Sequence, residues 1–253
     1  MDPRQVLPLK SIEYPERDGR PMGESDDHRD EMKDYVINVL KDFFAPDPMV
    51  YVSGNNFLYY AEGDPSVCVC PDTYVVKGVP NRQRNIYKVW EEGGHLPCFA
   101  LEVTSKNTRM EDLGDKMAKH RDDLGVREYF LFDPRADWVA SRLRGYVLEN
   151  GLYQPAPAGS SGRLLSRELG LEVGVDERHV RFFTPGSASP LPTREERADL
   201  EQQRAEQERQ RTEQERQRAE QERQRADSAE EEVRRLRVEL DRLRGGKPDT
   251  DRP

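Results

Sequence analysis

Cysteines and long apolar runs are scarce or missing in this sequence of 253 residues. The three cysteines, Cys68, Cys70 and Cys98, are too few for a disulfide framework, so we expect reduced thiols. No stretch has the length and apolar character of a membrane-spanning helix, and neither a signal-peptide pattern nor a lipidation motif is present. These absences predict a cytoplasmic protein with no membrane partner.

Positive charge is in deficit, with 40 Lys and Arg residues against 49 Asp and Glu residues and a net charge of −9. Bulk charge therefore gives no support to a nucleic-acid partner, because a phosphate backbone attracts basic surfaces. Hydrophobic residues make up only 34% of the chain, which is low for one uniform globule of this length. The excess of polar residues must be concentrated in one part of the chain.

That part begins at Arg194, directly after the segment TPGSASPLPT, and from Ala205 onward it repeats the heptads AEQERQR and TEQERQR. Glu and Arg spaced three or four residues apart predict a charged, exposed helix. The expected division is an irregular N-terminal arm at 1–24, a folded domain at 25–185, a linker at 186–193, a charged helix or coiled coil at 194–244, and a disordered tail at 245–253.

The charged helix ends in a short apolar seam. Val233, Leu236, Leu240 and Leu243 occupy successive seam positions over about two heptads, whereas the preceding repeat places Glu at every second seam position. We therefore expect weak association through this end of the helix. A homodimer through the helix or through the folded domain is predicted, and both interfaces remain open.

The folded domain alternates helix and strand patterns. Apolar spacing predicts one helix from His28 to Phe43 and another at 108–126. Residues 49–53, 56–60 and 67–76 have the spacing of an antiparallel meander, and further strands are predicted at 98–104 and 127–134. A strand, a helix and a strand in succession predict a parallel crossover. The result is an α/β domain with a mixed sheet flanked by helices.

Two of these strands each carry one acid among apolar neighbours, Asp72 in CPDTYVV and Glu102 in ALEVTSKNT. Strand alternation puts Glu102 on the face of Ala100, and two neighbouring strands could bring both carboxylates to one point. Paired carboxylates are ligands that Mg²⁺ or Mn²⁺ prefers, and such an ion takes substrate phosphate as a further ligand. The alternative is that each acid faces solvent at a strand end.

These motifs together resemble the Uma-two family of the PD-(D/E)XK nuclease superfamily. The matching residues are Pro71 and Asp72, Glu102 to Ser105, Thr108, Asp112, Lys116, and Leu124 to Pro134. The resemblance implies a restriction endonuclease-like fold, a mixed central sheet between helices, and a metal-dependent site that hydrolyses phosphodiester bonds. We therefore predict a DNA endonuclease with catalytic Asp72, Glu102 and Lys116, and Mg²⁺ or Mn²⁺ on the two acids. The alternative is an inactive nuclease fold that binds nucleic acid or protein.

The sequence departs from the superfamily pattern at Thr104, where a lysine is expected two residues after the second acid. Another cation must then stabilise the transition state. Lys106 shares the strand face of Glu102, and Lys116 lies at the edge of the apolar stripe of the following helix. The helical phase favours Lys116, as the family pattern also implies, and Lys106 remains the alternative.

His120, four residues after Lys116, could contact a phosphate or transfer a proton, but a half-buried aromatic packing role is favoured. Cys68, Cys70, His95 and Cys98 supply zinc-compatible ligand types, although their spacing favours buried small side chains.

Basic residues interleaved with aromatic ones occur in NRQRNIYKVWEEGG. Arg82, Arg84 and Lys88 could bind a sugar-phosphate backbone while Tyr87 or Trp90 stacks on a base. An ordinary surface loop is the equal alternative.

Overall fold

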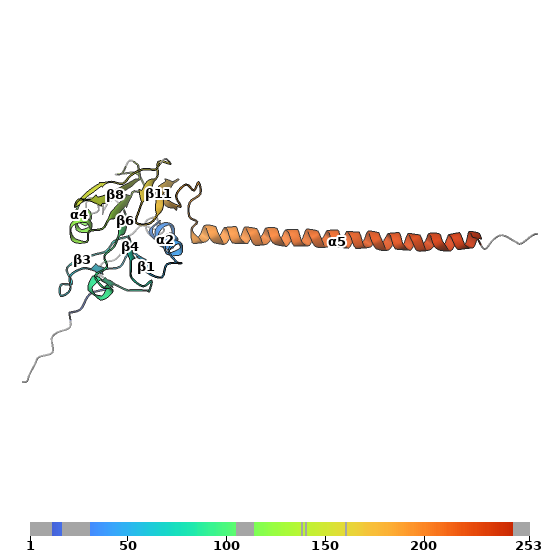
Figure 1. Cartoon of the computed structure of the whole chain (residues 1–253), viewed down its shortest axis with the longest axis horizontal. Coiled ribbons are helices and arrows are strands. Elements are labelled where there is room, and N and C mark those ends of the chain that lie inside the picture. The colour runs from blue at the N-terminus through green and yellow to red at the C-terminus, as the bar shows by residue number, and fades with distance from the viewer. Residues whose placement is uncertain are drawn as a thin grey trace, which may run out of the picture. The chain divides into compact units, whose positions relative to one another are not determined.

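The computed structural model describes residues 12–16, 31–104, 114–137, 139, 141–159 and 161–244. The chain divides into two units, Met1–Arg194 and Glu195–Pro253. The first unit contains the strands and short helices, and the second consists of one long helix in its described part (Figure 1).

A six-stranded mixed sheet forms the centre of the first unit, in the order β1-β4-β6-β7-β8-β9. Only β6 and β7 are parallel among these neighbours. The strands are β1 (Val50–Ser53), β4 (Thr73–Lys77), β6 (Phe99–Val103), β7 (Glu128–Phe132), β8 (Leu143–Glu149) and β9 (Leu152–Pro155). The predicted α/β fold with a mixed sheet and a parallel crossover is therefore confirmed.

Each face of this sheet has its own apolar core. Side chains at alternate positions of β6 enter opposite cores, since Phe99, Leu101 and Val103 belong to one cluster and Ala100 to the other. The first cluster also includes the N-terminal helical segment, η1 (Glu31–Ile37) and α2 (Asn38–Phe43), and the sheet of β10 (Leu164–Ser166), β11 (Leu171–Asp176) and β12 (His179–Phe183).

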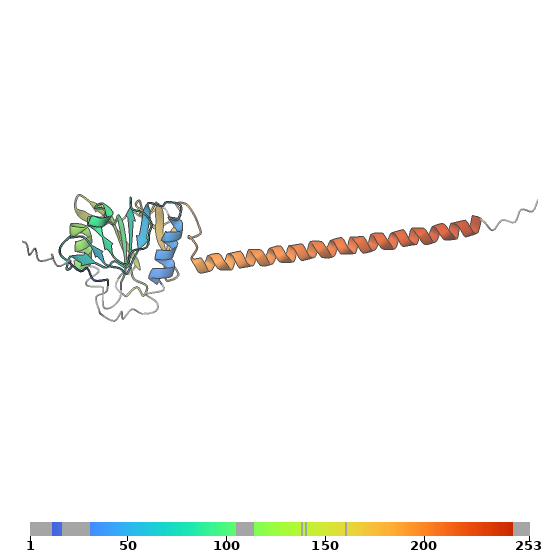
Figure 2. The same cartoon turned by 90° about the horizontal axis from the view of Figure 1, so that it is seen from below.

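The opposite face packs against α4 (Asp115–Ala118) and η3 (Lys119–Asp123), and against a sheet of β2 (Leu58–Tyr59), β3 (Cys68–Val69) and β5 (Tyr87–Lys88). The last strand of that sheet runs into η2 (Val89–Glu92). In Figure 2 the blue N-terminal helical segment and the green α4 lie on opposite sides of the strands. Glu102, one residue after Leu101, faces the α4 side.

The predicted antiparallel meander is wrong. β1 pairs with β4, while β2 pairs with β3 and with β5. The run 67–76 is not one strand, because Pro71 between β3 and β4 has no N–H group to continue a ladder. The carbonyl of Pro71 instead accepts a hydrogen bond from the N–H group of Asn55 at 2.9 Å.

Parts of both predicted helices fall outside the described residues. His28, the expected start of the first helix, is one of them, and so is the segment 105–113 at the start of the second. The described remainder of the second helix consists of α4 and η3, which precede β7.

The second unit contains the predicted charged helix. The helix α5 runs from Arg194, the last residue of the first unit, to Arg244, and has the ion pairs Arg211–Glu215 and Glu213–Arg216 along its surface. Within the described residues, no helix combines the length and the apolar character needed to cross a bilayer.

Candidate active site

Asp72, directly before β4, lies opposite Glu102 in the adjacent strand β6. β4 and β6 pair with Thr73 opposite Leu101, so the next residues outward are Asp72 and Glu102. Both side chains are buried rather than facing solvent, and Glu102 is 0% exposed. Strand pairing thus brings together the two predicted carboxylates.

Main-chain hydrogen bonds hold both carboxylates. The N–H group of Val103 donates to Asp72 Oδ2 at 2.7 Å, and the N–H group of Asp72 donates to Glu102 Oε2 at 3.4 Å. Each acid is therefore held by the strand that carries the other. Amide donors stabilise ionised carboxylates, which offsets part of the cost of burying two negative groups together.

A glycine is required beside this pair. A Cβ atom on Gly54 would lie 1.9 Å from the main-chain oxygen of Asp72, so no larger residue fits without moving that peptide. The sequence offered one signal for this contact, a glycine directly after a strand, but its partner could not be inferred from spacing.

Lys116 reaches the acids from α4. Its Nζ lies 3.3 Å from Glu102 Oε2, and its side chain is 21% exposed. A cation at this distance offsets the negative charge of the buried carboxylate. The competing Lys106 lies outside the described residues.

His120 completes the contacts around Glu102. Its Nδ1 lies 2.7 Å from the carbonyl oxygen of Lys116, and because a carbonyl only accepts, Nδ1 must carry the proton. Burial lowers the pKa of His120 to about 4, against the opposing effect of that hydrogen bond, so the ring is neutral near pH 7. Nε2 is then an acceptor, 3.8 Å from Glu102 Oε1, with no hydrogen-bond partner among the described residues.

The favoured packing role of His120 is also visible. The ring is fully buried and lies 5.0 Å from the ring of Tyr129, centre to centre. The same side chain thus packs on β7 and directs one nitrogen toward Glu102.

The donor set suits one kind of metal ion. Asp72 and Glu102 provide hard oxygen ligands, and Mg²⁺ commonly takes only one or two carboxylates and keeps several waters. A closed structural zinc site needs four protein ligands. The described residues contain no group of three or more His, Cys, Asp or Glu side chains arranged to hold a metal. The two acids fit a Mg²⁺-type ion and do not fit structural zinc.

Burial raises the thiol pKa of two cysteines. Cys70 lies close enough to the acids that burial, together with the charges of Asp72 and Glu102, raises the pKa of its thiol to about 12. Burial also raises the pKa of Cys98 to about 12, and its Sγ contacts the Val75 carbonyl oxygen at 3.4 Å. Both are therefore protonated thiols near neutral pH.

The basic stretch makes its own contacts within the domain. Arg84 binds Glu92 through Nε and Nη2, packs over the Tyr51 ring at 4.3 Å, and is only 4% exposed. Arg82 binds the same Glu92 but is 61% exposed. Lys88 pairs with Glu91. Arg84 is therefore held by the fold, whereas Arg82 presents most of its side chain to solvent.

Taken together, a mixed sheet, two interlocked carboxylates and an adjacent lysine define the restriction endonuclease-like class. The Uma2 family model, described as "Putative restriction endonuclease", matches residues 5–181, and the chain belongs to this family. Among solved structures, the chain is similar to one described as "a putative nuclease belonging to DUF820 from Anabaena variabilis ATCC 29413". The similarity has 16% identity and a TM-score of 0.40, and covers 59% of this chain and 83% of that chain. No curated protein matches the sequence.

Proposed function

We propose that this protein is a metal-dependent DNA endonuclease that hydrolyses phosphodiester bonds at Asp72, Glu102 and Lys116. The observation that carries the proposal is the interlocked pair of buried acids with Lys116 Nζ at 3.3 Å. A buried pair of carboxylates is costly for a fold and is typical of a functional site.

Asp72 and Glu102 would hold Mg²⁺ or Mn²⁺, which when bound polarises a phosphoryl oxygen and lowers the pKa of water. The main-chain donors from Val103 and Asp72 keep the two carboxylates oriented before any ion arrives. Such preorganisation lowers the cost of reaching the reactive arrangement.

Lys116 supplies the cation that the sequence lacks at Thr104. Its ammonium group can stabilise negative charge that develops on the phosphate during attack. His120 fixes the main chain at Lys116 through its Nδ1–H group and so sets where the lysine side chain starts. We assign His120 a positioning role and Lys116 the catalytic one.

DNA would be the substrate, bound by Arg82 and Lys88 through the phosphate backbone. Arg84 would support this segment through its contacts with Glu92 and Tyr51. Because each lost phosphate contact reduces the salt dependence of binding, Arg82→Ala should lower the slope of log affinity against log salt by about 1.

Cleavage of supercoiled plasmid in Mg²⁺ or Mn²⁺ tests the catalytic proposal. Asp72→Asn and Glu102→Gln, which keep side-chain volume, should abolish nicking, whereas Glu62→Gln at an exposed position should not. Equal nicking by wild type and Asp72→Asn would indicate a contaminating nuclease and reject the proposal.

The second candidate function is an inactive nuclease fold that binds nucleic acid or protein. Thr104 in the place of the expected lysine favours it, as does the acidic chain. Calorimetric titration with Mn²⁺ separates the two, because an inactive fold has no need to keep the ion. DNA binding without a metal site and without cleavage would favour this second function.

A further inference from the structure

The end of α5 exposes a row of large apolar side chains. Val233, Leu236 and Leu240 are each about half exposed, and Leu243 is 77% exposed. In heptad terms they occupy a, d, a and d, preceded by Ala226 at a and Ala229 at d. Val at a and Leu at d are typical of two-stranded coiled coils.

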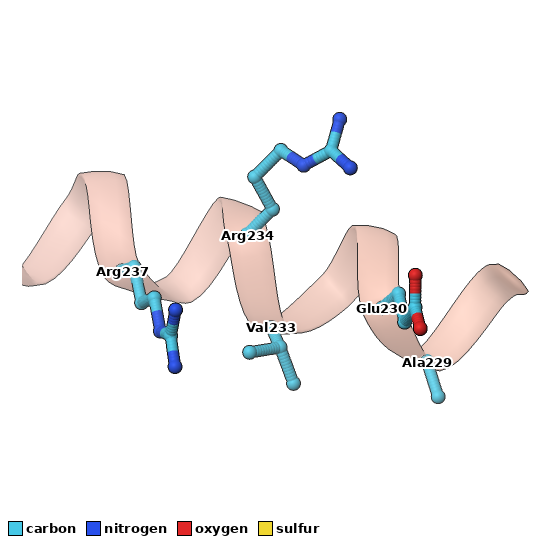
Figure 3. A pocket seen from close by; sticks show the side chains of 5 residues that line it. All are labelled: Ala229, Glu230, Val233, Arg234 and Arg237. Carbon is cyan, nitrogen blue, oxygen red and sulfur yellow. The ribbon is translucent and has the colours of Figure 1, made fainter. Parts of the chain in front are cut away.

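A shallow groove accompanies this row. It is lined by Ala229, Glu230, Val233, Arg234 and Arg237. Figure 3 shows Ala229 and Val233 on the same side of the helix, while Arg234 points away from them. In a coiled coil, residues at d, e and the following a surround the hole that receives a side chain of the other helix, and Ala229, Glu230 and Val233 are such a set.

We propose that the occupant is a second copy of this chain, and that the two helices pair parallel and in register over residues 225–243. Charges beside the seam carry this choice. In a parallel pair, a g residue meets the e residue five positions later on the other chain. Arg225 then meets Glu230, and Glu232 meets Arg237, and symmetry repeats both contacts. Each contact joins opposite charges.

These side chains are available for a partner. Ion pairs between residues of α5 occur earlier in the helix, as at Arg211–Glu215 and Glu213–Arg216. Within the described part of the helix, none of Glu230, Glu232 and Arg237 takes part in an intrachain ion pair.

The antiparallel arrangement is disfavoured by the same residues. If the two helices ran antiparallel with their large apolar side chains aligned, Val233 would lie beside Leu243 of the second copy, and Leu236 beside its Leu240. Glu239 would then face Glu239, and Arg237 would face Arg237. Like charges across an interface select against a pairing.

The upstream repeat does not extend the pair. It offers Glu at d, and its parallel g-to-e contacts join arginine to arginine, as at Arg211–Arg216 and Arg218–Arg223. Residues 195–224 therefore stay as single helices, about 45 Å long at 1.5 Å per residue. The pairing segment is confined to the end of the chain.

A parallel pair joins two nuclease units at the same end of the paired helices. If the proposed nuclease function holds, one assembly then carries two active sites, one for each DNA strand. The dimer itself does not depend on that function, so its test needs no DNA.

Sedimentation of the full chain over a concentration series tests the pairing. Wild type should form a dimer, Leu240→Asp should be monomeric, and Val238→Asp should behave as wild type. Val238 is the matched control because it is 53% exposed on the same helix but lies at f, outside the seam. A monomeric wild type at every concentration, or equal effects of Leu240→Asp and Val238→Asp, would overturn the proposal.

Charge reversal tests the orientation and register. Glu232→Arg should raise the dimer dissociation constant by about ten-fold, since two symmetry-related attractions become repulsions. Adding Arg237→Glu should restore the dimer only if residue 232 meets residue 237 of the other chain. Failure of that rescue would reject the parallel register.

A cysteine at the seam gives an independent readout. Leu236→Cys should form an interchain disulfide in a glutathione buffer, because equivalent d positions meet only in a parallel, in-register pair. Val238→Cys and wild type should not cross-link. Equal cross-linking by both variants would contradict the proposed alignment.

Discussion

Removal of the Lys116 charge is the sharpest test of the site. The substitution Lys116→Met removes that charge and keeps most of the apolar part of the side chain. This ammonium lies 3.3 Å from a carboxylate oxygen of Glu102, which is 0% exposed. The variant leaves that buried carboxylate with its main-chain donor and without its nearby cation. We therefore expect the metal-free protein to lose stability.

The size of the loss follows from distance and burial. Two unit charges 3.3 Å apart attract by about 5 kcal/mol at an effective dielectric constant of 20. Lys116 regains some hydration on removal from the pair because it is partly exposed, so we expect a net loss of about 3 kcal/mol. For a unit of this size that lowers the thermal midpoint by about 6–12 °C.

Divalent metal should reverse part of this loss. Removing Lys116 removes a positive charge that competes for the same carboxylate, so Mg²⁺ should raise the midpoint more in Lys116→Met than in wild type. Cleavage should nevertheless be lost. Circular-dichroism melts in EDTA and in saturating Mg²⁺ measure both effects, with Lys119→Met as an exposed control on the adjacent turn.

Three results would refute this reasoning. An unchanged midpoint in EDTA would show that the ion pair does not stabilise the fold. Loss of the Mg²⁺ response would make Lys116 part of metal binding rather than a separate cation. Retained cleavage would move the catalytic role to Lys106.

Three further predictions concern residues around the site and the core. Gly54→Ala should displace Asp72 and abolish cleavage and metal binding, whereas Gly159→Ala, whose Cβ would meet its nearest neighbour at an ordinary 3.4 Å, should retain both. Glu128→Ala should lower the free energy of unfolding by about 2–4 kcal/mol in urea denaturation, because it leaves the Ser166 hydroxyl and two main-chain N–H groups without their acceptor; a loss below that of an exposed control such as Glu149→Ala would contradict this. Burial raises the pKa of Glu31 in the folded protein, so the unfolded state releases its proton first and stability falls as pH rises through and above the ordinary value of 4.5. Glu31→Gln should flatten that part of the pH profile, and an unchanged profile would show that Glu31 does not contribute.

The alternation of side chains along a strand predicted which face of the sheet Glu102 occupies. It put Glu102 on the face of Ala100, and those two residues do share a face of β6. It could not show that Asp72 lies directly opposite, because the register between β4 and β6 depends on side-chain packing across the sheet. The prediction of one continuous run at 67–76 was wrong. Hydrophobic periodicity does not take into account that Pro71 lacks an N–H group, and the chain passes from one sheet to another at this residue.

Local composition was less informative for the basic stretch. Arg82, Arg84 and Lys88 are interleaved with aromatic residues, as in a nucleic-acid-binding segment, but this pattern does not show which charges the domain neutralises itself. Glu92 binds both arginines, and the Tyr51 ring from β1 covers Arg84. Contacts between a loop and a distant strand are set by the tertiary fold, so a sequence pattern predicts the charge but not its availability.

The substitution at Thr104 explains why α4 matters to this site. A lysine two residues after Glu102 would directly follow β6, a strand paired on both sides, at a position where the main-chain N–H group bonds the Phe132 carbonyl. Lys116 instead starts from a four-residue helix, which short-range propensity alone would not keep in place. Burial of His120 against Tyr129, with its Nδ1–H group bonded to the Lys116 carbonyl, ties that helix to β7. The buried histidine thus fixes the position of the helix that carries Lys116. Strand pairing would have fixed the position of a lysine at 104 in the same way.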